Sequence, residues 1–254
     1  MGSIKESLRK FVDDPDHYNG EFPQHMVKLD AFWISKYQIT NAQYAMFLNA
    51  MGNQEEGGVT WLKADGYGVR IHKLGGGWRA DSGYADHPVV EVSWYGARAY
   101  AEWIGACLPT EAEWEKAARG TDGRIYPWGN ELPTDDLCNF GDRDRGTTPV
   151  GTYSPQGDSP YGCADMAGNV WEWTRSLWKD YPYDPTDGRE DPDSEAVRVL
   201  RGGAFGSSRS YVRCDCRLWD DPYSRGSGYG FRVSVSLSLS STTFRMAMGL
   251  VPFG

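Results

Sequence analysis

Apolar residues recur with helical spacing shortly after residue 40. Thr40 is a good N-cap, because its hydroxyl can accept a hydrogen bond from a free backbone N–H of the first turn. The helix that follows is predicted to bury one apolar face. That face comprises Ala42, Met46, Phe47 and Ala50.

Two further helices are expected between residues 93 and 120. Ser93 is the candidate cap of the first, whose apolar face comprises Tyr95, Ala99 and Trp103. The second lies in "LPTEAEWEKAARG", where Thr110 and Glu113 fit a capping box. Gly120 is suited to end this helix, since glycine readily adopts the left-handed conformation at a C-terminus.

Strand signals are shorter and less regular. Residues 25–37, "HMVKLDAFWISKY", alternate and predict a pair of strands, and the Gly-rich residues 52–88 predict short strands and turns. After Gly120 the sequence has little period and many turn-forming residues. The fold is therefore summarised as α+β, with two helices plus an irregular β-rich half and little regular secondary structure. We expect residues 1–254 to form a single domain.

Length and charge narrow the class of protein. A chain of 254 residues can bury a core without disulfides. Its net charge of -9 argues against nucleic acid as the main partner. No apolar window approaches the roughly 18 residues needed to span a bilayer, so no membrane insertion is expected. The first 20 residues lack the apolar centre of a signal peptide. Cytoplasmic residence at synthesis is the default expectation, with secretion or surface display left open.

The five cysteines do not form a disulfide or zinc pattern. Their number is odd, their spacing is irregular and no Cys-x-x-Cys pair occurs. We expect reduced, partly buried thiols. One alternative concerns Cys214 and Cys216, which would point to the same face of a strand and could bind a metal.

Six motifs occur in an order that is typical of one known family. They are "FWISKYQITNAQYAMFLN", "HPVVEVSWYGARAYAEWIG", "LPTEAEWEKAARG", "YPWGN", "DMAGNVWEWT" and "RGGAF…GFRV". In these motifs the chain resembles the formylglycine-generating-enzyme (sulfatase-modifying factor) family. The resemblance implies a C-type-lectin-like fold for nearly the whole chain up to about Val233. The tail, residues 234–254, lies outside it.

The resemblance does not extend to the catalytic residues of the family's oxidases. Those enzymes hold Cu(I) with two cysteine thiolates, five residues apart, just after the Gly-Gly motif. The matching positions here are Ser207 and Val212, so neither copper nor oxidase activity is expected. An iron enzyme of the same family would need a cluster of histidines. The four histidines are dispersed, at His17, His25, His72 and His87.

The segment from Ala204 to Tyr229 resembles another branch of this fold, the variable proteins of diversity-generating retroelements. In that branch, adenines of an Asn codon are randomised, which excludes Lys, Glu, Gln, Met and Trp. None of the first four occurs in the segment. Trp219 is the exception, and we interpret it as fixed framework together with Arg213, Arg217, Arg225 and Phe231.

The hypothesis is a non-catalytic ligand-binding protein with a hypervariable surface diversified by a retroelement. Tyr, Ser and Gly in this segment match the bias of antibody paratopes, and Asp215, Asp220 and Asp221 would favour a basic protein or surface ligand. The alternatives are a formylglycine-generating-type oxidase or related metal-dependent enzyme, and a structural member without a specific ligand. The predicted contact residues are Gly206, Ser207, Ser208, Ser210, Tyr211, Asp215, Cys216, Leu218, Asp220, Asp221, Tyr223, Ser224, Gly226, Ser227, Gly228 and Tyr229.

The motif "DMAGNVWEWT" has a structural interpretation and a metal-binding one. Trp171 and Trp173 would point to the same side of a strand as core anchors. The resemblance also implies structural Ca²⁺, a cation that prefers oxygen ligands. The implied ligands are Asp165, Gly168, Val170 and Glu172, with a second set at Asn139, Phe140 and Asp142. The alternative for Asp165 and Glu172 is capping of the backbone turn.

Overall fold

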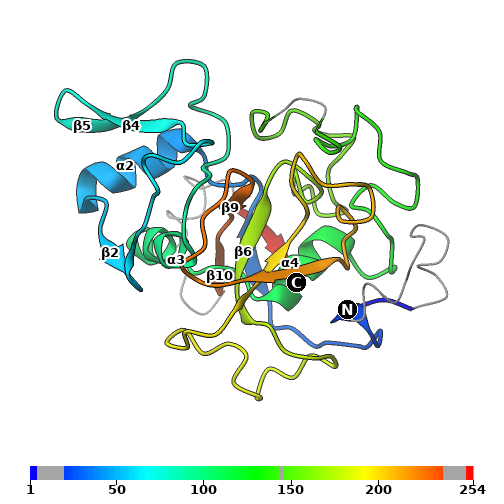
Figure 1. Ribbon diagram of the computed structural model, residues 1–254. Helices are drawn as coiled ribbons and strands as arrows, with labels where there is room; N and C mark the ends of the chain where they lie inside the picture. Colours follow the sequence, from blue (N-terminus) through cyan, green and yellow to red (C-terminus); the bar gives the residue numbers. More distant parts are fainter. Residues whose placement is uncertain (5–19, 143–145, 237–249, 254) are drawn as a thin grey trace.

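The computed structural model describes residues 1–4, 20–142, 146–236 and 250–253 (Figure 1). Three α-helices occur among them: α2 (Asn41–Met51), α3 (Trp94–Trp103) and α4 (Glu111–Arg119). All three expected helices are therefore confirmed, and the summary of two helices was one too few. His17 lies outside the described residues.

The predicted caps are confirmed, but the predicted buried faces are partly wrong. Thr40 and Thr110 each form a complete capping box, and the Ser93 hydroxyl accepts from the Gly96 N–H. Helix α2 buries Tyr44, Ala45, Phe47 and Leu48. Of the predicted apolar face only Phe47 is buried, and Met46 is 65% exposed. The Phe47 ring stacks on Trp61, with 5.1 Å between ring centroids. This contact places the Phe47 side of the helix against the core.

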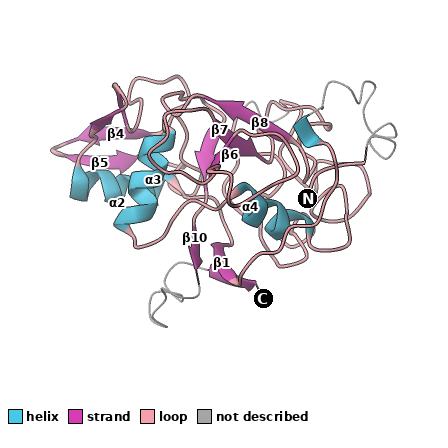
Figure 2. Cartoon of the chain, turned by 90° about the horizontal axis from the view of Figure 1, so that it is seen from below, coloured by secondary structure: helices cyan, strands magenta, loops and turns pink. Residues whose placement is uncertain are grey.

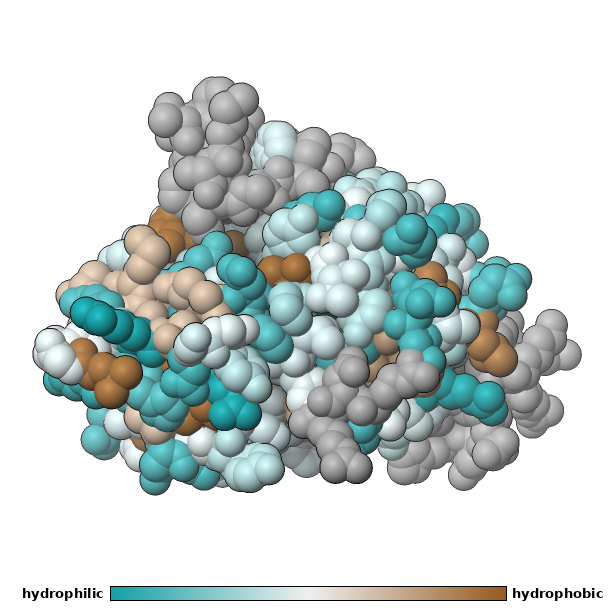
Figure 3. Space-filling view, turned by 90° about the horizontal axis from the view of Figure 1, so that it is seen from above, coloured by the Kyte–Doolittle hydropathy of each residue, from teal (hydrophilic) through white to brown (hydrophobic). Residues whose placement is uncertain are grey.

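The face predicted for helix α3 is confirmed at Tyr95 and Ala99, which pack in or against the core, and is wrong at Trp103. Trp94, Tyr95 and Tyr100 are buried on it, whereas Trp103 is exposed. Apolar residues therefore remain on the outer side of the lobe that carries α2, β4 (Ile71–Leu74) and β5 (Gly77–Ala80). Figure 3 shows apolar colours gathered on this lobe, while much of the rest of that face is hydrophilic.

A four-stranded sheet crosses the centre of the molecule, in the order β8-β7-β6-β9. Its strands are β6 (Trp171–Leu177), β7 (Arg198–Arg201), β8 (Arg217–Asp220) and β9 (Tyr229–Phe231). β7 runs antiparallel to β6 and β8, and β9 runs parallel to β6. β8 is therefore an edge strand. Figure 2 shows β6 and β7 between the α2–α3 lobe and α4.

The strand pair expected in residues 25–37 is wrong. Only β1 (Phe32–Ser35) forms there, and its partners come from the end of the chain: β10 (Ser234–Ser236) and β11 (Leu250–Phe253). The tail is therefore joined to the domain by backbone pairing on both sides of β1, although residues 237–249 lie outside the described part. The short strands expected in residues 52–88 are confirmed as the hairpins β2–β3 (Glu55–Glu56, Val59–Thr60) and β4–β5.

The main core packs α2 and α3 against the central sheet. Trp171 and Trp173 are both buried in it, which confirms them as core anchors. The indole N–H of Trp173 donates to the Val92 carbonyl oxygen at 3.0 Å. Among the described residues, no helix has the length and apolar character that a membrane span requires.

Candidate functional site

Segment 204–229 leaves β7 through two glycines and returns to the sheet twice, as β8 and as β9. Gly202 and Gly203 have φ of 97° and 76°. A Cβ on Gly203 would lie 2.7 Å from Cγ1 of Val212. The Gly pair therefore turns the chain sharply and lets it pack against its own continuation.

The middle of the segment is buried, which corrects two predicted contact residues. Residues 212–217 are all buried, including Asp215 at 2% and Cys216 at 0% exposure. Neither can touch a ligand from outside. The reason is that Arg213 and Arg217, on either side of Asp215 and Cys216, form ion pairs inside the protein, and these pairs keep the chain between them buried.

Arg213 is the centre of the first ion-pair group. Its Nη2 lies 2.8 Å from Oε1 of Glu21, and its Nη1 lies 2.6 Å from Oδ1 of Asp215. The Ser3 hydroxyl donates to the second oxygen of Asp215. Segment 204–229 is thereby connected to residues near the start of the chain.

Arg201 and Arg217 attach the same region to α4. Arg201 Nη2 donates to Oε2 of Glu115 at 2.5 Å, and its two Nη groups also donate to carbonyl oxygens of residues 214–216. Arg217 Nε donates to Oε1 of Glu111 at 2.5 Å. The Arg217 guanidinium also lies 4.0 Å from the Tyr181 ring centroid. Arg213 and Arg217 are therefore framework, as expected, and Phe231 is likewise buried.

The carboxylates of this network were not predicted. Glu111 and Glu115 are four residues apart on α4, and Arg119 follows after another four, so helical spacing places all three on one face. This spacing of charged residues on α4 could have been used to predict a charged cluster on one face of the helix. Glu21 had none, since it lies in an irregular stretch and meets Arg213 across 192 positions.

The cysteines are free and mostly buried. Burial raises the pKa of the Cys214 and Cys216 thiols, so they stay protonated at neutral pH and do not offer the thiolates that a metal needs. Among the described residues, no group of three or more His, Cys, Asp or Glu side chains is placed to hold a metal. Of the two positions that match the oxidase cysteines, Val212 is buried, and the Ser207 hydroxyl accepts from the Ala204 N–H at 2.9 Å.

The outer surface of the segment is formed by residues on either side of its buried middle. Five of its side chains or backbone positions are exposed: Gly206, Ser208, Arg209, Trp219 and Tyr223. Trp219 and Tyr223 are each 49% exposed. The interpretation of Trp219 as buried framework is therefore wrong. It lies on the edge strand β8, opposite Val199, and its ring extends into solvent.

The remaining predicted contact residues are half-buried, and several are held by internal contacts. Asp220 accepts from the Tyr229 and Ser224 hydroxyls at 2.9 and 2.7 Å, and Leu218 packs against the main core. Arg225, assigned to the framework, is also half-buried and donates to Thr60. The half-buried set comprises Ser207, Ser210, Tyr211, Leu218, Asp220, Asp221, Ser224, Gly226, Ser227, Gly228 and Tyr229.

The first implied calcium site does not fit the structure. Both oxygens of the buried Glu172 carboxylate are used: Arg232 donates to each, at 2.8 and 2.7 Å, and Gln38 and Trp114 each donate to one. A cation would have to displace the Arg232 guanidinium, a buried charge that would be left without its partner. Glu172 is therefore assigned to an ion pair. Asp165 accepts from the Gly151 N–H at 2.6 Å, which agrees with its alternative role in the turn.

The second implied site offers a donor that suits calcium. Oδ1 of Asn139 is buried and has no hydrogen-bond partner among the described residues. Asn139 lines a cavity of about 310 Å³ together with Phe140 and Thr148. Asp142 follows at φ 60°, and its N–H donates to the Phe205 carbonyl at 2.7 Å. This loop is thus directly connected to the start of segment 204–229.

The sequence matches the sequence model of a known protein family over almost its whole length. The family is "Sulfatase-modifying factor enzyme 1-like domain", and the match covers residues 3–237. A formylglycine-generating enzyme of Thermomonospora curvata is 36% identical over 89% of each chain. A protein named serine/threonine-protein kinase pkn1, from Chlamydia pneumoniae, is 39% identical over 86% of this chain. This chain spans only 35% of that protein.

Solved structures confirm the fold. PvdO from Pseudomonas aeruginosa has a TM-score of 0.67 and 27% identity, with 86% of both chains covered. Treponema denticola variable protein 1 has a TM-score of 0.61 and 22% identity, covering 86% of this chain and 89% of that one. The expected fold of the formylglycine-generating-enzyme type, C-type-lectin-like and low in regular secondary structure, is therefore the fold of this chain.

Replacing Arg213 and replacing Trp219 are expected to have opposite consequences for stability. Arg213→Ala removes the cation paired with the buried Glu21 and leaves Asp215 only the more distant Arg119, at 3.7 Å, which should cost about 3–5 kcal/mol. Trp219→Ala removes a half-exposed ring and should cost about 1 kcal/mol or less. Urea midpoints of the two variants measure both effects. A larger loss from Trp219→Ala than from Arg213→Ala would contradict the assignment.

The Asp165 carboxyl should make stability depend on pH. Burial raises its folded pKa from an ordinary 3.8 to about 6, so ionisation is less favourable in the folded state than in the unfolded chain. Its contribution is therefore fully present below about pH 4 and is lost as the pH rises through 6. Asp165→Asn keeps an oxygen for the Gly151 N–H, and its stability should gain on wild type between pH 4 and 7. Parallel urea midpoints across that range would contradict this effect.

Proposed function

This chain belongs to the sulfatase-modifying factor enzyme 1-like family, and we propose that it is a non-catalytic member that binds a ligand through the outer surface of segment 204–229. The observation that carries the proposal is the division of this segment. Its middle is pinned by buried ion pairs, while Ser208, Trp219 and Tyr223 extend into solvent. A rigid support with exposed aromatic and hydroxyl groups is suited to binding, because few side chains lose freedom when a partner is bound.

The chemistry of the segment supports a role without catalysis. Copper chemistry in the related oxidases depends on thiolates, and Ser207 and Val212 supply none. Cys214 and Cys216 cannot substitute for them, since both thiols are buried and protonated. We therefore propose that no copper is bound. The sequence similarity to formylglycine-generating enzymes keeps oxidase activity as the alternative that needs testing.

Diversification by a retroelement is the finer part of the proposal. It is supported by the absence of Lys, Glu, Gln and Met from residues 204–229. Trp219 is not among the residue types that a randomised Asn codon can encode, and because it is exposed, packing does not explain its presence. If the segment is diversified, the Trp219 codon must therefore be identical in the template repeat. Sequencing the flanking DNA tests this: a neighbouring reverse transcriptase gene and a near-identical repeat are expected, and their absence would exclude diversification.

Structural calcium is proposed at Asn139, Phe140 and Asp142. An ion bound only by the native state stabilises it by about 2.7 kcal/mol at 100-fold excess over Kd. Calcium should raise the wild-type melting temperature relative to chelator, and Asn139→Ala should abolish that rise. Glu172→Gln serves as the control: it should weaken the ion pair with Arg232 equally in calcium and in chelator. A melting temperature of the wild type that ignores chelator would remove the calcium proposal.

Purified protein supplied with Cu(I) should not convert the cysteine of a Cys-x-Pro-x-Arg peptide to formylglycine. The reason is the absence of the two thiolates at positions 207 and 212. Mass spectrometry of the peptide measures the aldehyde, and a formylglycine-generating enzyme serves as positive control. Aldehyde formation at a catalytic rate would refute the non-catalytic assignment.

Binding is tested by selecting peptides from a displayed library on the folded protein. Selected peptides should lose affinity at least tenfold for a variant carrying Ser208→Ala, Trp219→Ala and Tyr223→Ala. They should keep it for a matched variant with three exposed residues elsewhere replaced, Met46→Ala, Tyr67→Ala and Leu74→Ala. Peptides that lose affinity only for the second variant would overturn the proposed binding surface.

A further inference from the structure

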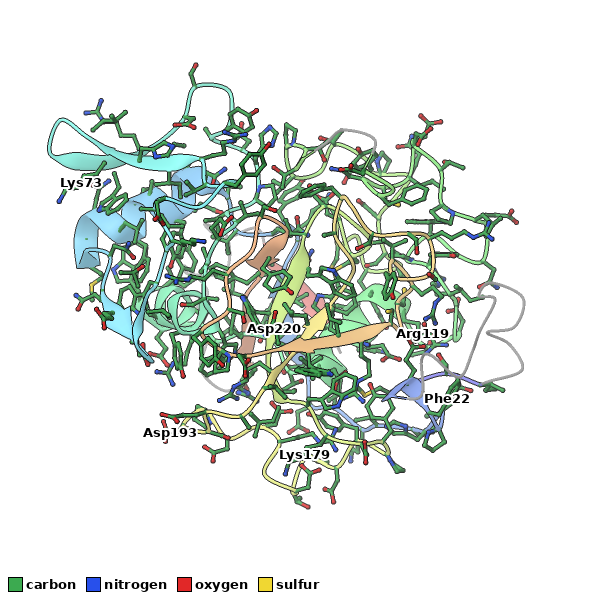
Figure 4. All side chains as sticks on the ribbon, viewed as in Figure 1. Phe22, Lys73, Arg119, Lys179, Asp193 and Asp220 are labelled. Carbon is green, nitrogen blue, oxygen red and sulfur yellow. The ribbon has the colours of Figure 1, made fainter. Side chains whose placement is uncertain are left out.

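Two loops meet at the end of the central sheet where β8 finishes. One is residues 221–223, which directly follow Trp219 and Asp220 of β8. The other is residues 190–197, which lead directly into β7. The first residue of β7, Arg198, pairs in the sheet with Asp220, the last residue of β8. In Figure 4 the labelled Asp193 lies below and to the left of Asp220.

Trp94 holds both loops in place. Its backbone N–H donates to the Pro222 carbonyl at 3.0 Å, which fixes the turn between Asp221 and Tyr223. The Arg198 guanidinium lies over the Trp94 ring, 3.8 Å from its centroid, in a cation–π contact. Arg198 in turn donates to carbonyl oxygens of residues 191, 192 and 194. One buried tryptophan thus sets the relative position of the two loops.

The exposed groups on these loops are aromatic and acidic. Trp219 comes from the end of β8 and Tyr223 from the loop after it, and the loop before β7 exposes three carboxylates, at Asp191, Asp193 and Glu195. None of the three forms an ion pair with another described residue. Arg198 is buried and donates to backbone carbonyls of the loop. Arg98 donates to the Pro192 carbonyl at 3.0 Å and is paired with Glu56, so neither arginine forms an ion pair with the three carboxylates.

This surface is complementary to a positively charged chain. Lys and Arg side chains pair with carboxylates and also lie favourably over the faces of tryptophan and tyrosine. Asp221 adds to the negative charge, and its hydrogen bond with the Tyr223 hydroxyl raises the pKa of that group, so the ring stays neutral. Anionic partners, including nucleic acid and acidic membranes, would meet repulsion here.

We infer that Trp219, Asp221 and Tyr223, together with Asp191, Asp193 and Glu195, form the docking site for a Lys- and Arg-containing segment of a partner protein. The inference rests on the proposed binding function and adds two things to it. It specifies the chemistry of the partner, and it extends the binding surface to a loop outside segment 204–229.

The test uses two fluorescein-labelled twelve-residue peptides, one with alternating Arg and Gly and one with alternating Glu and Gly, and fluorescence anisotropy with the full-length protein. The basic peptide should bind, and the acidic one should not. The Kd for the basic peptide should rise at least tenfold for Asp193→Asn/Glu195→Gln, and separately for Trp219→Ala. It should also rise with salt, as expected for exposed charges.

The matched control is Glu131→Gln/Asp136→Asn, which removes the same charge from two exposed carboxylates of another loop. It should change the Kd less than twofold. No binding of the basic peptide, or equal losses from the two double variants, would overturn the inference. The library selection distinguishes this failure from failure of the binding function. If library peptides still require Trp219 and Tyr223, the binding surface stands, and only the basic partner and the contribution of the second loop are disproved.

Discussion

A buried set of arginine–carboxylate pairs is the constraint on which segment 204–229 depends. Arg201, Arg213 and Arg217 come from this strand-loop-strand region, and their carboxylates come from α4, from Glu21 and from Asp215 of the segment itself. Each guanidinium is buried away from water. If the segment moved and separated these ion pairs, the buried charges would lose their partners at a cost of several kcal/mol. An irregular, Gly- and Ser-rich sequence is therefore held in one conformation without much regular secondary structure or any disulfide among the described residues.

The same constraint explains why the surface and the framework alternate. The chain enters the ion-pair network, leaves it at the exposed end of β8, and returns to the core at Phe231. Between the fixed points, the exposed side chains of Ser208, Trp219 and Tyr223 are available for contact. Leu218, Asp220 and Tyr229 are half-buried and make internal contacts instead. The loop at Asn139–Asp142 is tied to the start of the segment through the Ser207 and Phe205 carbonyls, so an ion bound there would stiffen the same surface.

Much of the fold could be predicted from the sequence, because its signals are local. Capping boxes at Thr40 and Thr110 and the core tryptophans of "DMAGNVWEWT" depend on residues that are close in the chain. The strand pair in residues 25–37 failed because the true partners of β1 come from the far end of the chain. Met46 was placed inside because helical spacing alone does not say which of two apolar sides of α2 faces Trp61.

The site was harder to predict for the same reason. Asp215 was assigned to the surface as a charged residue in a polar stretch, and only the meeting of Arg213 with Glu21, 192 positions away, explains its burial. Trp219 was assigned to the framework because it is outside the residue types that the randomised codon allows, but its place on the edge strand β8 leaves its ring exposed. Glu172 was given to calcium by resemblance, whereas Arg232 uses both of its oxygens in this chain.

Amide hydrogen exchange along residues 201–229 tests the central claim most directly, because it reports how each part of the segment opens. If buried ion pairs fix the middle of an exposed surface, the Cys214 N–H, bonded to the Ile125 carbonyl at 2.8 Å, should exchange as slowly as the Trp173 N–H of β6. The Ser208 and Tyr223 amides should exchange many times faster. Rapid exchange of Cys214 together with Ser208, as one loop that opens without the sheet, would contradict the account.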